Sequence, residues 1–377
     1  IRVDGQWWLE DASIVGNDVV FDGEILEAEE DDAGNITVIA GDGLTLKDAA
    51  DKKYTMISSD GKTIYVPPAG LTLPSGTGIE KIESRWHNVA IKTDDAVEIE
   101  LHRNDVTVQG GNGALDISAD RVLGASIKTG SGDDQIWMGR VQDVNLDLGN
   151  GDNNVNIEGD EGNNANISIE GGSGNDNIAI DGVVKANVKG GGGNDYISAY
   201  GSHITVEGGA GNDALYGRGN KIVIVGGAGN DTVATEGNWI YKYASGDGND
   251  TVHPEGTGVG IIELTSGSLS STLASGDDLI LSVKSSTVTG TLRLLNAALD
   301  PVRVKVGRGN ASLINNNVAR SIVNTKTDTV IIGSTSSDSF YNYAANVSID
   351  GGLGSDYIQN INGSKVTMHG GKGNDTL

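Results

Sequence analysis

Aspartates recur along this chain at nearly constant intervals, and each one ends a glycine-rich turn of six residues. The best copies of the turn read Gly-Gly-x-Gly-Asn-Asp, as at Gly208–Asp213 and Gly226–Asp231. Steps of 19, 23, 19, 18, 18 and 19 residues separate the members of the first series, which are Asp134, Asn153, Asp176, Asp195, Asp213, Asp231 and Asp250. Steps of 18 and 19 separate those of a second series, Asp338, Asp356 and Asp375. Each turn therefore offers a side-chain oxygen beside carbonyls that glycine allows to point to one spot.

Fixed periods of 18 or 19 residues predict a solenoid, in which each repeat is one coil that buries its apolar side chains against the next coil. Stacking places each Asp about 4.8 Å from its neighbour, and a column of like charges is unfavourable unless a cation lies between them. A flexible array of about six to eight hard oxygen ligands favours Ca2+ over Mg2+ or zinc. The spacing therefore predicts a ladder of calcium ions along one edge of the solenoid.

We expect one ion between each pair of consecutive coils from Asp176 to Asp250, and another between Asp356 and Asp375. Each ion is expected to be held by Asp carboxylates of both coils and by turn carbonyls. The predicted metal ligands are Asp134, Asn153, Gly171, Ser173, Asp176, Gly190, Gly192, Asp195, Gly208, Ala210, Asp213, Gly226, Ala228, Asp231, Ser245, Asp247, Asp250, Gly351, Asp356, Gly370 and Asp375.

Three turns depart from the pattern. Asn153 supplies a neutral amide oxygen in place of a carboxylate, so sites that involve it are expected to be weak or empty. Leu115 stands where a carboxylate belongs, with Asp116 one place late, and the turn that ends at Asp338 has lost most of its glycines. Substitution of Asp213 is therefore expected to disturb two neighbouring ions, and substitution of Asp116 none.

Two columns of apolar residues indicate the strands that carry these turns. One column lies two residues after each Asp and includes Ile178, Ile197 and Val233. The other lies two residues before each Gly-Gly pair and includes Ile169 and Val188. Apolar and polar residues alternate around both columns, as in NISIEGG and HITVEGG, which is the period of strands with one buried face. Each coil is thus expected to contain two short strands and two turns.

The second turn of each coil, as in IDGVV and AYGSH, has one glycine and no aligned carboxylate. We therefore predict an all-β fold, a parallel β-roll or β-helix solenoid with a calcium ladder on one edge, plus β-rich flanking and spacer segments. The predicted division is a β-rich N-terminal segment over 1–87, a calcium-binding β-roll over 88–252, a β-rich spacer over 253–327 and the start of a second calcium-binding β-roll over 328–377.

The repeat Gly-Gly-x-Gly-Asn-Asp-x-apolar-x resembles the haemolysin-type nonapeptide of RTX (repeats-in-toxin) proteins, which binds calcium in that family. Consensus copies stand at Gly171–Ile178, Gly190–Ile197, Gly208–Leu215 and Gly226–Val233. In the family, consensus nonapeptides often occupy both turns of a coil, whereas here they occupy one. The resemblance implies export of an unfolded chain that folds outside the cell, where calcium is abundant. It also implies a one-step export channel and an uncleaved C-terminal signal beyond Leu377.

Composition excludes several classes of function. The chain of 377 residues has 26 Lys and Arg against 52 Asp and Glu, a formal net charge of −26, so binding to nucleic acid or anionic membranes is not expected. Cysteine is absent, which excludes a disulfide framework. No apolar run approaches the roughly 18 residues of a membrane span, so no membrane insertion is expected. Calcium ions, and self-association through the open ends of a roll, are the expected partners.

We found no catalytic motif and expect no enzymatic activity. His87, His102, His203, His253 and His369 form no His-x-x-x-His pattern and are interpreted as ordinary surface or turn residues. The sequence favours a calcium-binding structural segment of a secreted bacterial surface or extracellular matrix protein, such as an adhesin, surface-layer or fibre subunit. The alternative is a calcium-binding C-terminal module of a secreted enzyme such as a lipase, protease or alginate epimerase.

Overall fold

The structure, a computed structural model, is all-β. It describes strand backbones within residues 1–61 and most of residues 62–377, except positions 66–69, 74, 85–86, 160–163, 256–259, 276–277, 287, 296–302, 307–311, 314–320, 325–326, 328 and 334–335. These described parts contain no helix, and so none that could cross a membrane. The chain divides into two compact units, Ile1–Ser173 and Gly174–Leu377.

Antiparallel strands form the beginning of the first unit. A two-stranded pair, β1 (Arg2–Val3) and β2 (Gln6–Trp7), comes first. A meander follows, made of β3 (Ala12–Val15), β4 (Asp18–Phe21), β5 (Glu24–Glu30), β6 (Ile36–Ala40), β7 (Leu44–Ala49), β8 (Lys53–Ser58) and β9 (Thr63–Tyr65).

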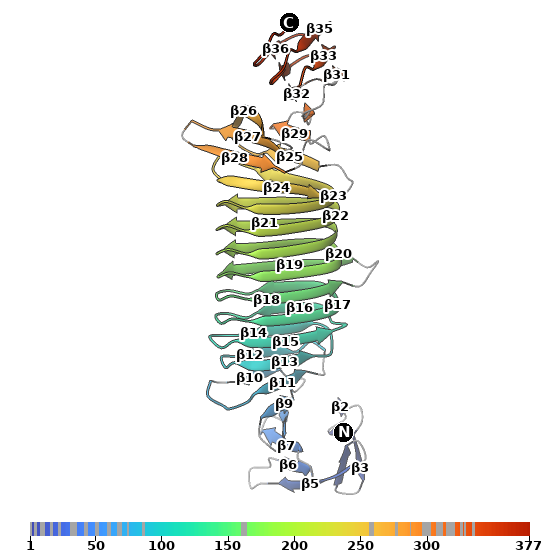
Figure 1. Cartoon of the computed structure of the whole chain (residues 1–377). Helices are drawn as coiled ribbons and strands as arrows, with labels where there is room; N and C mark the ends of the chain where they lie inside the picture. The colour runs from blue at the N-terminus through green and yellow to red at the C-terminus, as the bar shows by residue number, and fades with distance from the viewer. Residues whose placement is uncertain are drawn as a thin grey trace. The chain divides into compact units, whose positions relative to one another are not determined.

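Parallel coils form the rest of the first unit (Figure 1). One stack of parallel strands contains β9, β11 (Lys81–Ser84), β13 (Val97–Leu101), β15 (Leu115–Asp120), the start of β17 (Gln135–Asp147) and β18 (Asn154–Gly159). A second stack contains β10 (Leu71–Leu73), β12 (Ala90–Thr93), β14 (Val106–Gln109), β16 (Leu123–Lys128), the end of β17 and β19 (Asn164–Ser173). Ile99, Ile117 and Ile136 pair in register and are buried, as the alternation predicts.

The second unit begins with the most regular coils. Its strands are β20 (Asn177–Gly192), β21 (Tyr196–Ala210), β22 (Ala214–Ala228), β23 (Thr232–Tyr243) and β24 (Asn249–Glu255). All neighbours in this set pair in parallel. Ile178, Ile197 and Val233 of one predicted column are fully buried, and burial of each such side chain contributes about 1.5–3 kcal/mol.

The strands that follow form a spacer at the end of this stack and then two further parallel sheets. A spacer consists of β25 (Gly260–Leu264), β26 (Ser268–Ser275), β27 (Asp278–Lys284), β28 (Thr289–Leu294), β29 (Arg303–Val306) and β30 (Ser312–Leu313). Two three-stranded parallel sheets come last, β31 (Ser321–Asn324), β33 (Ser339–Asn342) and β35 (Tyr357–Asn360), and β32 (Thr329–Ile332), β34 (Val347–Asp350) and β36 (Val366–His369). Phe340, Ile349 and Ile358 fill the core of this second roll.

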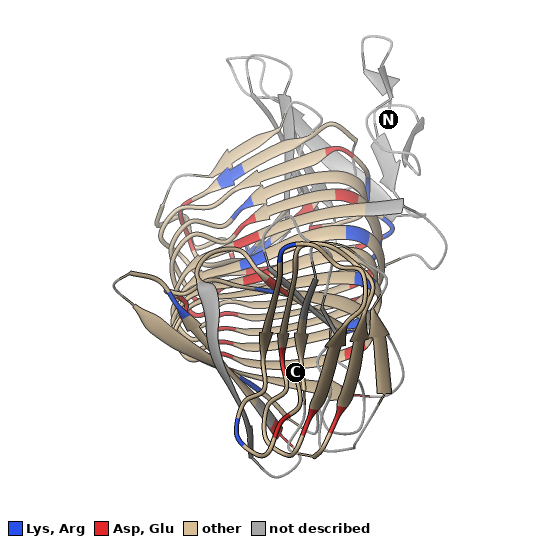
Figure 2. Cartoon of the chain, turned by 90° about the horizontal axis from the view of Figure 1, so that it is seen from above, with Lys and Arg blue, Asp and Glu red and all other residues tan. Residues whose placement is uncertain are grey.

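The parallel β-roll predicted from the sequence is confirmed, but its pairing extends beyond the expected limits. Parallel pairing begins at Thr63, before residue 88, because these early coils carry the apolar column without the glycine turn. It continues past residue 252, since β25 and β28 pair in parallel with β23 and β24. The second roll begins at Ser321 rather than residue 328. Figure 2 colours the ribbon red at Asp and Glu, and such positions recur from coil to coil.

Candidate metal centre

The glycine-rich turn brings backbones of adjacent coils too close for any side chain at two of its positions. Gly209 has φ +124° and Gly211 has φ +138°, values that favour glycine. A Cβ atom at Gly209 would lie 2.0 Å from the carbonyl oxygen of Gly191, and one at Gly211 would lie 1.6 Å from that of Gly193. The second and fourth glycines of the repeat are therefore required by the stacking itself.

The final Asp of each turn points into the coil and accepts a hydrogen bond from the coil before it. The backbone N–H of Asp195 donates to Asp213 Oδ1 at 2.8 Å, and that of Asp213 donates to Asp231 Oδ1 at 2.8 Å. The same bond links Asp176 to Asp195, Asp231 to Asp250, Leu115 to Asp134, Asp338 to Asp356 and Asp356 to Asp375. These aspartates therefore form a continuous ladder through each run of turns, with one carboxylate oxygen committed to the backbone.

A second ladder, which the sequence interpretation missed, runs along the outside of the same turns. Asn194, Asn212 and Asn230 each donate a backbone N–H to the Oδ1 of the Asn in the preceding coil, at 2.7, 2.7 and 2.8 Å. The direction is opposite to that of the Asp ladder. The signal was the Asn at the fifth position of every consensus turn, a residue whose side chain often bonds to nearby backbone.

The other carboxylate oxygen of the ladder is buried and lacks a hydrogen-bond donor. This holds for Oδ2 of Asp195, Asp213, Asp231 and Asp356, residues that are each 2% exposed. A buried polar atom left without a partner costs about 1–3 kcal/mol, and more when it is charged. Four such atoms in equivalent places could each accept a proton or a cation.

A carbonyl oxygen of the next coil lies near each of three unpartnered Oδ2 atoms. A Cβ atom placed on Gly190 would lie 2.1 Å from Asp195 Oδ2 and 2.7 Å from the carbonyl oxygen of Gly208. At Gly208 the corresponding distances are 2.3 Å to Asp213 Oδ2 and 2.6 Å to the Gly226 carbonyl oxygen. The same arrangement occurs at Gly351, with Asp356 Oδ2 and the Gly370 carbonyl oxygen both at 2.5 Å. We call each such place a rung. It lies between the first residue of a glycine-rich turn, the final Asp of that turn and the carbonyl of the first residue of the next turn.

Not all of the predicted carbonyl ligands face a rung. Those at the third position of the turn instead accept a backbone N–H from the preceding coil. Their bonds are Gly151 to Ser173, Gly174 to Gly192, Gly193 to Ala210, Gly211 to Ala228 and Gly229 to Asp247, at 2.6–2.9 Å. The structure thus brings the carboxylates together with the first-position carbonyls and places the third-position carbonyls in the sheet ladder.

Asn153 fits its coil without a charge. Its Oδ1 accepts the N–H of Asp134 at 3.0 Å, and its Nδ2 donates to the Gly151 carbonyl at 3.1 Å. In the same turn, Leu148 replaces the first glycine and is fully buried. This turn therefore has the hydrogen bonds of the ladder but not its charge.

Burial raises the pKa of the ladder carboxyls above the usual 3.8. The pKa of Asp195 rises to about 6, chiefly through burial, with the neighbouring Asp213 and Asp176 adding to the effect and the Asp176 N–H opposing it. Burial likewise raises the pKa of Asp231 to about 7 and that of Asp250 to about 6. Protons and a cation therefore compete for the same buried oxygens.

The cation-free chain is expected to lose stability as the pH rises from about 4 to about 7. Because the pKa values of Asp195 and Asp231 are raised on folding, the folded state binds more protons across this interval, and that stabilisation is lost as the pH passes through about 6 and 7. Melting temperatures in metal-free buffers at pH 4.5 and 7.5 measure the effect. The pKa values of Asp95 and Glu100 are lowered, so these two carboxyls change the stability of the fold at lower pH. A melting temperature that rises with pH would contradict the expectation.

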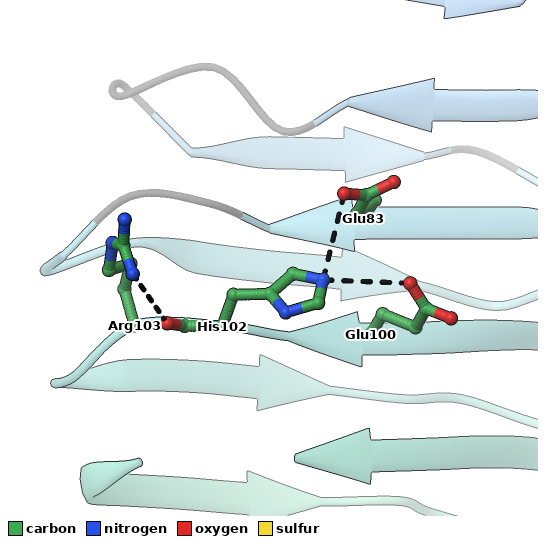
Figure 3. A pocket seen from close by; sticks show the side chains of 4 residues that line it. All are labelled: Glu83, Glu100, His102 and Arg103. Atoms are coloured by element: carbon green, nitrogen blue, oxygen red, sulfur yellow. Dashed lines mark hydrogen bonds and ion pairs between the residues drawn. The ribbon is translucent and has the colours of Figure 1, made fainter. Parts of the chain in front are cut away.

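A different cluster of possible metal ligands lies on the outside of the first unit (Figure 3). Glu83 pairs in register with Glu100 on the next coil, and His102 Nε2 lies 3.6 Å from Glu83 Oε1 and 3.5 Å from Glu100 Oε2. The sequence interpretation missed it because its members come from separate coils. Lys81 Nζ already lies 2.6 Å from Glu100 Oε1 and lowers the pKa of that carboxyl. The cluster is therefore partly neutralised, unlike the rungs.

The assignment of the ladder as the candidate metal centre depends on this geometry. In equivalent turns, the ladder has buried carboxylate oxygens without hydrogen-bond donors, carbonyl oxygens near them, and carboxyl groups whose pKa values are raised. No protein-family model matches the chain, and no curated protein sequence matches it.

Proposed function

We propose that this chain is a calcium-binding structural segment of a secreted bacterial surface or extracellular matrix protein, and that it folds when it binds calcium outside the cell. The observation that carries the proposal is the set of buried Oδ2 atoms without a donor, three of which, those of Asp195, Asp213 and Asp356, lie near a carbonyl of the next coil. A buried carboxylate is tolerated when it is paired or coordinates a metal. Oxygen ligands alone, with no nitrogen or sulfur, favour a hard cation such as Ca2+.

The residues that would hold the ion belong to three rungs. Asp195 with the Gly208 carbonyl, Asp213 with the Gly226 carbonyl and Asp356 with the Gly370 carbonyl supply the oxygens. The ion would supply the positive charge that these oxygens lack. The chain itself prepares the site, because the hydrogen bond to Oδ1 fixes each carboxylate and leaves Oδ2 directed at the rung.

The resemblance to RTX proteins supports the extracellular part of the proposal. Calcium is abundant outside cells, and an unfolded chain has no preformed rung because each one requires two stacked coils. The net charge of −26 also opposes compaction when no cation is bound. Folding would therefore be delayed until the chain reaches a compartment rich in calcium.

Asp213→Asn tests the proposal directly, because asparagine keeps the oxygen that accepts the Asp195 N–H and removes the charge of Oδ2. We expect the variant to bind fewer calcium ions than the wild type and to gain less thermal stability from calcium, while its calcium-free stability is equal or higher. The matched control is Asp116→Asn, on an exposed side chain outside the ladder. Calorimetric titration and melting measure both quantities. Equal stoichiometry and equal calcium-dependent stabilisation in the two variants would refute the proposal.

A further inference from the structure

The rungs are not all alike, because in some coils a side chain lies where the others have a glycine or a backbone carbonyl. Gly190, Gly208 and Gly351 begin turns in which the atoms nearest to an added Cβ belong to the Asp of the turn and to a carbonyl of the next coil. We call these three open rungs. The turns of the first unit, and the last turns of the regular stack in the second unit, differ from them residue by residue.

In the three turns of the first unit that begin at Gly110, Thr129 and Leu148, an apolar or hydroxyl side chain replaces a residue of the consensus turn. At Gly110, Leu115 replaces the Asp, and its Cδ1 would lie 2.8 Å from an added Cβ atom. In the next turn Thr129 replaces the first glycine, and its hydroxyl donates to the Leu148 carbonyl at 2.7 Å. That carbonyl corresponds to the Gly208 carbonyl of an open rung. In the third turn, the buried Leu148 stands at the glycine position and the neutral Asn153 at the Asp position.

In the second unit, Tyr241 ends the run of open rungs. Its side chain is fully buried, and its hydroxyl donates to Asp250 Oδ2 at 2.6 Å. A Cβ atom on Gly226 would lie 2.6 Å from this hydroxyl and 2.2 Å from Asp231 Oδ2, so the tyrosine oxygen occupies the place taken by a backbone carbonyl at Gly190 and Gly208. Tyr241 therefore lies between the two carboxylates that the sequence pattern assigned to one calcium site.

We infer that the chain contains two kinds of coil: coils with rungs filled by Leu115, Leu148 and Tyr241, which fold without a cation, and coils with open rungs, which require one. Tyr241 is then a built-in substitute for the ion between Asp231 and Asp250, and it ends the ladder. The inference rests on the proposed calcium binding. It adds that the first unit supplies coils that are already folded when calcium is absent.

Hydrogen exchange of the whole chain, followed by mass spectrometry with calcium and after its removal, tests the two kinds of coil. Amides of β13, β15 and β17 should remain protected in both conditions, whereas those of β21 and β22 should exchange at least tenfold faster without calcium. Equal loss of protection in both groups would overturn the inference while leaving calcium binding intact. Protection that nowhere depends on calcium would instead overturn the proposed function.

Substitutions at the end of the ladder test Tyr241 itself. Asp250→Asn should leave the number of bound calcium ions unchanged, because the hydroxyl of Tyr241 already occupies that rung. Tyr241→Phe should add one ion, and the double variant Tyr241→Phe, Asp250→Asn should lose it again. Calorimetric titration against calcium alone counts the ions. A loss of one ion in the single variant Asp250→Asn, or no gain in Tyr241→Phe, would show that tyrosine does not replace the cation.

Discussion

Removal of calcium is expected to unfold the coils that carry the open rungs. Each independent site adds about 2.7 kcal/mol at a hundredfold excess of calcium over its Kd, so three sites together add roughly 8 kcal/mol. A domain has a total stability of about 5–15 kcal/mol, which makes this contribution comparable with the whole. Charge repulsion among the buried carboxylates acts in the same direction, since with a pKa of about 6 Asp195 is mostly ionised at neutral pH, and with a pKa of about 7 Asp231 is partly ionised.

Circular dichroism at neutral pH, with calcium and after dialysis against a chelator, measures this expected loss of β structure. Magnesium at the same concentration is the control, because it demands a stricter octahedral geometry and gives up its water reluctantly. It should restore little of the signal. A spectrum and melting curve that are the same with and without calcium would rule out a ladder that supports the fold.

Gly211→Ala is expected to destabilise the regular coils by at least about 4 kcal/mol, in the range of the most damaging single substitutions. The new Cβ atom would lie 1.6 Å from the Gly193 carbonyl oxygen, and the φ of +138° is unfavourable for alanine. Neither coil can move away without breaking the hydrogen bond from the Gly193 N–H to the Ala210 carbonyl, which lies next to the substitution.

The matched control is Gly246→Ala, in a glycine-rich turn of the same stack, where an added Cβ atom meets nothing within 4 Å. Urea unfolding in saturating calcium should show a large decrease in stability for Gly211→Ala and less than about 1 kcal/mol for the control. Similar midpoints for the two variants would mean that the close approach at Gly211 is relieved at little cost.

The period of the Asp series and the alternation around Ile178 and Ile197 were sufficient to predict the parallel solenoid. Both signals report the same physical fact, that one residue of each coil packs on its equivalent in the next. The coils at 63–84 were missed because that part of the chain has no glycine-rich turn, whereas parallel pairing needs only the buried alternation. An apolar pattern without turn signals does not by itself distinguish parallel from antiparallel neighbours.

The ladder was predictable in outline but not in detail. The sequence shows that Asp213 recurs with its turn, and the structure adds that one oxygen is bonded to the backbone while the other is not. Tyr241 carries no sequence signal for its role, because it lies in the apolar column, and only its depth in the coil places the hydroxyl beside Asp250. The Glu83–His102 contact likewise depends on which coils are adjacent.

The opposite directions of the Asn and Asp ladders make each coil of the regular stack interchangeable with its neighbours. The Asn side chain of a coil bonds to the coil after it, and the Asp side chain bonds to the coil before it, so every donor is met by a copy of the same turn. Duplication or loss of one whole period, such as the 18 residues between Asp213 and Asp231, would leave both ladders intact. Steps of 18 and of 19 residues both keep the two ladders, so the turn itself, rather than one fixed period, determines the pairing. Duplication or deletion within the gene can therefore lengthen or shorten the solenoid by one full coil at a time. Each such step changes the number of open rungs.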